Sequence, residues 1–138
     1  MFEIRRIFAG WMDAKFSESG NLFSFSYIQD VKADLDDLFL LDPNEEKVCD
    51  FDLEGEDIRV QTKRYDDIIT ISISDANTGK PFGTYKHNYF DYVKEYVAQF
   101  REYQVVYITE FEYHDKDDYV WETNNWKRLE EIADGERL

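Results

Sequence analysis

Cysteine is almost absent from this chain: Cys49 stands alone among 138 residues, so no intrachain disulfide can form. Its alternation with Phe51 and Leu53 predicts an inert thiol in the core. Long apolar runs are also missing, and none approaches the roughly 18 residues that a membrane-spanning helix needs. Residues 1–10 carry three charged side chains and lack the apolar stretch of a secretory signal. These absences predict a cytoplasmic protein without a membrane partner.

Basic residues are scarce in two segments, and these segments hold the entire net charge of −15. Residues 30–57 carry twelve acids against two lysines, and residues 110–122 carry six acids against one lysine. The remainder has 13 acids and 13 bases. Charge gathered in patches can steer a basic protein partner, whereas it repels nucleic acid and anionic membranes.

The length and composition predict one folded domain spanning residues 1–138. Hydrophobic residues make up 43% and aromatic residues 17% of the chain, which argues against disorder despite the charge. Apolar periodicity predicts an α+β fold, a mostly antiparallel β-sheet with two to three helices packed against it. The expected strands and hairpins are 1–8, 11–28, a hairpin with its turn at 55–56, 68–74, 82–86 and 105–113, and the expected helices are 30–41, 88–102 and 123–133.

Two hairpins can be given a register. A turn at Ser19-Gly20 places Phe16 opposite Phe23 and Ala14 opposite Phe25, on one apolar face. A two-residue turn at 55–56, with glycine first, suits the second hairpin. It pairs Leu53 with Ile58, Phe51 with Val60 and Asp52 with Arg59, and the next strand adds Ile71 and Ile73 beside Thr62 and Val60.

The helices carry apolar stripes. Asp30 is the expected N-cap of the first helix, whose stripe comprises Val31, Leu35, Leu38 and Phe39. In the second helix Tyr89, Tyr92 and Tyr96 recur at helical spacing. One interpretation places them at the edge of the core with their hydroxyls in contact with water. The other places them in an interface. The second interpretation belongs to the alternative function, a structural or scaffold module that forms a homodimer through this helix. The stripe of this helix consists of Tyr89, Val93, Tyr96, Val97 and Phe100.

Catalytic motifs are weak. The two histidines, His87 and His114, stand in no nucleophile motif, and residues 77–81 lack the first glycine and the Ser/Thr of a P-loop. Residues 50–55 begin like a calcium loop, but Gln61 replaces the bidentate twelfth-position Glu. A weak cation site at Glu54, Glu56 and Asp57 and a small carboxylate-dependent enzyme stay open as alternatives. No cofactor, resident metal or catalytic residue is assigned.

The acidic segment supplies the candidate site, because its helical acids are all Asp, a poor helix former with few rotamers to lose on binding. We expect a non-catalytic acidic binding protein, most concretely an inhibitor or immunity protein that occludes a basic partner such as a toxin domain. The residues expected to bind that partner are Asp34, Asp36, Asp37, Asp50, Glu54, Glu56 and Asp57.

A resemblance points the same way. The strand end 25–30, the helix ending at 35–38 and the acidic hairpin 51–56 together resemble a pattern in small uncharacterised bacterial proteins. It covers roughly residues 11–60 and implies no activity. Many acidic bacterial α+β proteins of this type are similar to immunity proteins, in character rather than in motif.

Overall fold

The fold is α+β, as the sequence predicts, but the strands form two antiparallel sheets where the sequence led us to expect one, with a layer of helices against them. The computed structural model describes residues 1–112 and 116–135. The first sheet, in the order β1-β2-β3, comprises β1 (Glu3–Phe8), β2 (Trp11–Lys15) and β3 (Phe23–Ser26). The second, in the order β4-β5-β6-β7, comprises β4 (Glu46–Asp52), β5 (Asp57–Tyr65), β6 (Ile68–Asp75) and β7 (Pro81–Asn88).

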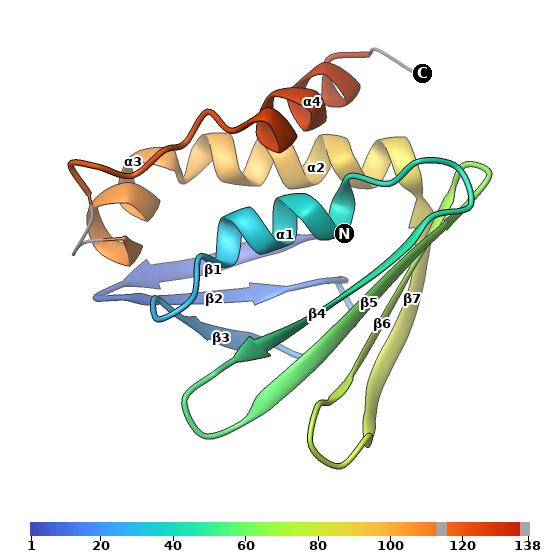
Figure 1. Ribbon diagram of the computed structural model, residues 1–138, viewed down its shortest axis with the longest axis horizontal. Helices are drawn as coiled ribbons and strands as arrows, with labels where there is room; N and C mark the ends of the chain where they lie inside the picture. Colours follow the sequence, from blue (N-terminus) through green and yellow to red (C-terminus); the bar gives the residue numbers. More distant parts are fainter. Residues whose placement is uncertain (113–115, 136–138) are drawn as a thin grey trace.

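The helices lie along one side of both sheets, with α4 outermost (Figure 1). They are α1 (Val31–Phe39), α2 (Tyr89–Glu102), the short α3 (Gln104–Val106), the π-helix η1 (Tyr107–Phe111) and α4 (Asn124–Ala133). The N-cap expected at Asp30 is confirmed, and Asn88 and Thr123 cap α2 and α4 in the same way: each side chain accepts a backbone N–H in the first turn of its helix. Within the described residues, no helix is long and apolar enough to cross a membrane.

One hydrophobic core joins the inner faces of both sheets to the helix stripes. The expected stripe of α1 is buried, and so is that of α2. Strand β5 shows the period of two expected for a half-buried sheet: residues 58, 60, 62 and 64 face inward and their neighbours face outward. Its predicted pairing with β6, Val60 opposite Ile73 and Thr62 opposite Ile71, is confirmed.

Both predicted hairpin registers are wrong by two residues. Ala14 faces Phe23 rather than Phe25, and Ile58 faces Phe51 rather than Leu53. The second turn is centred on Glu54-Gly55, both at positive φ, one residue earlier than expected. Moving a turn centre by one residue moves the pairing by two, so every side chain keeps its predicted face.

The strand predicted at 105–113 is wrong, because residues 104–111 are helical; Tyr113 falls outside the described residues. The sequence predicts a strand here because every second residue from 105 onward suits a buried strand face. Of these residues Tyr107 and Phe111 are buried, whereas Val105 is 76% exposed. A spacing of four residues fits one face of a helix as well as one face of a strand, and the rings of Tyr107 and Phe111 stack 4.8 Å apart.

Candidate functional site

The seven acids expected to bind a partner divide between two places. Three lie on α1 and four lie at the end of the β4–β5 hairpin, which projects away from the helix layer (Figure 1). The α1 group consists of Asp34, Asp36 and Asp37, and the hairpin group consists of Asp50, Glu54, Glu56 and Asp57. The four hairpin acids share one hairpin, and Asp34 lies near Asp50, because the Gln29 amide donates to the Asp34 carboxylate and to the Asp50 carbonyl.

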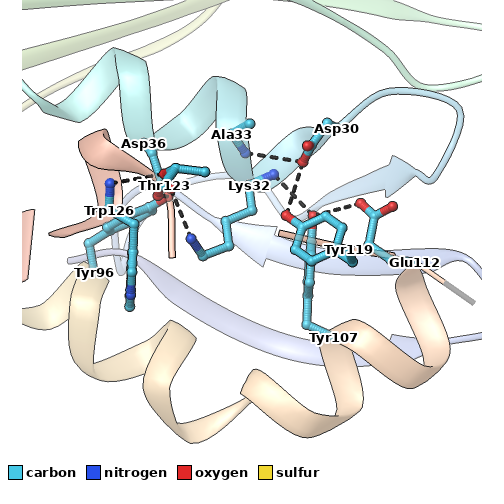
Figure 2. A network of polar contacts seen from close by, with 10 residues as sticks. All are labelled: Asp30, Lys32, Ala33, Asp36, Tyr96, Tyr107, Glu112, Tyr119, Thr123 and Trp126. Carbon is cyan, nitrogen blue, oxygen red and sulfur yellow. Dashed lines mark hydrogen bonds and ion pairs between the residues drawn. The ribbon is translucent and has the colours of Figure 1, made fainter. Parts of the chain in front are cut away.

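Asp36 does not lie on the surface, which corrects its assignment as a partner-binding residue. Its side chain is 1% exposed and forms an ion pair of 2.8 Å with Lys32, which is equally buried. The Tyr96 hydroxyl donates a second hydrogen bond of 2.6 Å to the same carboxylate (Figure 2). Burial raises the pKa of Asp36 to about 6, and burial lowers the pKa of Lys32.

Two tryptophans complete the surroundings of the Lys32 ammonium, which lies 3.9 Å from the ring centroid of Trp126 and 4.4 Å from that of Trp121. Close approach of a desolvated cation to an indole face is attractive. Lys32 also donates its backbone N–H to the Tyr107 hydroxyl at 3.0 Å, and that hydroxyl donates to Glu112 at 3.2 Å (Figure 2). This buried network joins α1 to α2, η1 and α4.

The other two acids of α1 also have intramolecular partners. The Gln29 amide donates to Asp34 at 2.8 Å and to the Asp50 carbonyl at 3.0 Å, which ties the start of α1 to β4. Lys47 donates to the carbonyls of Asp37 and Leu40 at 2.9 and 2.8 Å, and to the Asp37 carboxylate at 3.2 Å. A cation at these last carbonyls compensates the C-terminal dipole of α1. Asp34 and Asp37 therefore fix the helix on the sheet.

The hairpin end keeps its acids at the surface. Asp50 receives two hydrogen bonds from Arg59, at 2.8 and 3.0 Å, which lower its pKa. The Ser26 hydroxyl donates to the Glu54 carboxylate. Among the described residues, no side chain hydrogen-bonds or ion-pairs with the carboxylates of Glu56 and Asp57. We call residues 50–59 the acidic tip; it holds five acids and one arginine.

Two acids of the acidic tip oppose each other directly. Asp52 and Asp57 form the last pair of the β4–β5 ladder before the turn. Like charges placed opposite each other in a hairpin destabilise it. Asp52 has a structural role, because its carboxylate accepts the backbone N–H of Glu54 at 2.8 Å. In the described part of the chain no side chain pairs with the Asp57 carboxylate, so stability of the isolated chain does not account for an acid at position 57.

A shallow groove of about 370 Å³ runs beside the turn, between the start of β3 and the acidic tip. Leu22, half exposed, and Leu53, partly buried, contribute apolar lining, and Glu54 and Glu56 also line it. A lining that combines leucine side chains with carboxylates suits a long basic side chain, which packs its stem on apolar surface and keeps its charged head near the carboxylates.

The alternatives receive no support from the geometry. In the part of the chain that the structure describes, no group of three or more His, Cys, Asp or Glu residues could hold a metal ion, and this includes Glu54, Glu56 and Asp57. Tyr89, Tyr92 and Tyr96 are fully buried, so the tyrosine face of α2 is core rather than an interface. The Nε2 atom of His87 is buried, and burial lowers its pKa; His114 lies outside the described residues.

Sequence reasoning missed Lys32 and the groove. Lys32 and Asp36 are spaced i,i+4 and border the apolar stripe of α1, which is the signal that could have indicated a buried pair. Leu22 and Leu53 come together only through tertiary structure, so no local pattern marks them. Cys49, expected in the core, is half-buried beside Gln29.

In comparisons with known proteins, no family model, no curated protein and no solved structure matches the chain. Its function has to be argued from the acidic tip and its groove.

Proposed function

We propose that this protein is a non-catalytic binding module that occludes a basic protein partner, in the manner of an inhibitor or immunity protein, through the acidic tip. The observation that carries the proposal is the Asp52–Asp57 pair beside Glu56, because these carboxylates repel one another in the free chain. A cationic partner surface would remove that repulsion. The proposal keeps the cytoplasmic bacterial setting expected from the sequence.

The acidic tip suits recognition in two ways. Its uncompensated charge would attract a basic surface and speed association, toward about 10⁸–10⁹ M⁻¹ s⁻¹ at low salt in favourable cases. The groove beside it would take the aliphatic stem of one lysine or arginine, which adds apolar contact. A stable complex buries roughly 800 Å² on each partner, so neighbouring faces of the two sheets would also take part.

A charge-reversal variant tests the proposal. The sequence alone suggests a charge reversal at Asp36. That change to lysine would place a second ammonium beside Lys32 in the core and disrupt the fold. Glu56→Lys with Asp57→Lys instead changes an exposed and a half-exposed carboxylate with which no side chain of the described residues forms a hydrogen bond or an ion pair. Glu95→Lys with Glu102→Lys makes the same change of net charge on the exposed side of α2 and serves as the matched control.

The three proteins are immobilised and exposed to lysate at low and at high salt, and retained proteins are identified by mass spectrometry. We expect one basic protein to be retained by the wild type and by the α2 control, and to be lost from the tip variant. Association kinetics with that purified protein should then slow at high salt. Equal retention by the tip variant, or retention of no basic protein, contradicts the proposal.

A further inference from the structure

Arg64 on β5 is a buried cation with which no carboxylate of the described residues forms an ion pair. Its side chain is 6% exposed, and its guanidinium carbon lies 4.5 Å from the ring centroid of Tyr89 and 5.1 Å from that of Phe90. Nε donates to the Asp66 carbonyl and Nη1 to the Leu41 carbonyl, both at 2.9 Å. Within residues 1–112 and 116–135, no carboxylate ion-pairs with Arg64 and no acceptor engages Nη2.

This is unusual because buried charges in proteins are normally paired. Acids are abundant in this chain, which carries 31 of them against 16 lysines and arginines. The two carbonyl oxygens hold the guanidinium in place but supply no negative charge. The arrangement leaves one edge of a fixed cation available to an anion from outside the fold.

Arg64 borders a cavity of about 240 Å³ between the α1–β4 connection, β5, the start of α2 and the outer helix α4. Leu40, Phe90 and Ile132 supply apolar wall. The charged residues at the cavity are Lys47, Arg64, Arg128, Asp42 and Glu45. The cavity lining thus carries a small excess of positive charge, in a protein whose net charge is −15.

The size and charge of the cavity restrict the ligand. Pockets for drug-sized ligands span roughly 300–1,000 Å³, so this cavity is too small for a nucleotide or a large coenzyme. Asp42 and Glu45 at its wall would repel a phosphate dianion more strongly than a single carboxylate. The planar guanidinium is well matched to a carboxylate, to which it can donate parallel hydrogen bonds.

We propose that the Arg64 cavity binds a small monocarboxylate with an apolar substituent. The carboxylate accepts hydrogen bonds from the free edge of the Arg64 guanidinium, and the apolar substituent lies against Leu40, Phe90 and Ile132. Lys47 already donates to three oxygens of Asp37 and Leu40 at the end of α1, so it contributes positive potential rather than a hydrogen bond. This site is separate from the acidic tip and does not depend on the function proposed for it.

Titration of isotope-labelled protein followed by NMR tests this proposal, with isovalerate and benzoate as probes. Benzamide is the neutral counterpart of benzoate, and inorganic phosphate is the competing anion. We expect saturable shifts at Leu40, Phe90 and Ile132 with both carboxylates and none with benzamide. Equal binding of benzamide, tighter binding of phosphate, or no saturable shift with either carboxylate overturns the proposal.

Three variants locate the site. Arg64→Met should weaken benzoate binding at least tenfold, whereas Lys63→Met removes the same charge from the exposed face of the same strand and should leave it unchanged. Leu40→Phe fills the cavity without touching the cation and should abolish binding. Leu40→Phe is expected to keep the two hydrogen bonds of Arg64. It therefore tests the binding site even if the Arg64→Met variant does not fold. Unchanged benzoate affinity in Leu40→Phe overturns the proposal.

Discussion

Replacing Lys32 by methionine should destabilise the fold in a way that depends on pH. Methionine fills a similar volume between Trp121 and Trp126 and keeps sulfur–aromatic contact, but it leaves the buried Asp36 carboxylate without its cation. Removing one partner of a buried ion pair typically costs about 3–5 kcal/mol. A domain of this size has a total stability of roughly 5–15 kcal/mol, so the loss is a large fraction of it.

The pH dependence follows from Asp36. Burial already raises its pKa to about 6, above the ordinary 3.8, and Lys32 opposes that rise. Without Lys32 the pKa of Asp36 in the folded protein rises further. An acid with a raised folded-state pKa holds its proton more tightly when folded, so its stabilising contribution is full below pH 3.8. That contribution is lost as pH increases through the folded-state pKa, at up to about 1.4 kcal/mol per pH unit.

Urea unfolding followed by tryptophan fluorescence, at pH 5 and at pH 8, measures this effect. The control is Lys32→Met combined with Asp36→Asn, because asparagine accepts the Tyr96 hydrogen bond but cannot ionise. We expect the single variant to lose far more stability than the double variant between the two pH values. Every other carboxylate is common to both proteins, so the difference isolates Asp36.

Two results would refute this reasoning. One is a Lys32→Met variant that loses less than about 1 kcal/mol at pH 8, which would mean that the carboxylate is not buried uncompensated. The other is a parallel pH dependence of the single and double variants. Either result would show that Asp36 reaches solvent in the folded protein.

Three smaller predictions concern other parts of the fold. Asp57→Asn should raise the free energy of unfolding by about 0.2–1 kcal/mol in thermal melts, because it removes the repulsion from Asp52; a loss of stability would contradict this. Burial raises the pKa of Cys49 to about 11, so alkylation by iodoacetamide at pH 8 should be about a hundredfold slower than in urea; equal rates would refute it. Tyr96→Phe should destabilise more than Tyr92→Phe in urea titrations, by about 1 kcal/mol, since Tyr96 donates to a carboxylate and Tyr92 to the carbonyl of residue 16; equal losses would count against this.

The sequence predicts the architecture better than the site. Periodicity identifies the stripes of α1 and α2 and the faces of β5 and β6, because burial of a face repeats along an element. It places turn centres less well, since Gly55 can serve as either the first or the second residue of a two-residue turn. It fails at residues 105–111, where every second residue suits a strand and every fourth suits a helix.

The candidate site was only half predictable, because negative charge in a sequence does not distinguish a surface acid from a buried one. Asp36 and Asp37 are neighbours, yet one pairs with Lys32 in the core and the other is largely exposed. That difference depends on the rotation of α1 against α2 and α4. The Arg64 cavity likewise assembles from four elements far apart in the sequence, and no local pattern marks it.

The packing of Trp121 and Trp126 over Lys32 has a consequence for how the chain folds during synthesis. Both sheets and α1 are complete by residue 88, but Trp121 and Trp126 emerge later. Until they arrive, Lys32 lacks the two indole rings that lie against its ammonium, and α1 lacks its outer neighbour, α4. The nascent chain can therefore form its strands early, whereas the docking of α1 becomes final only when the last helix closes over it.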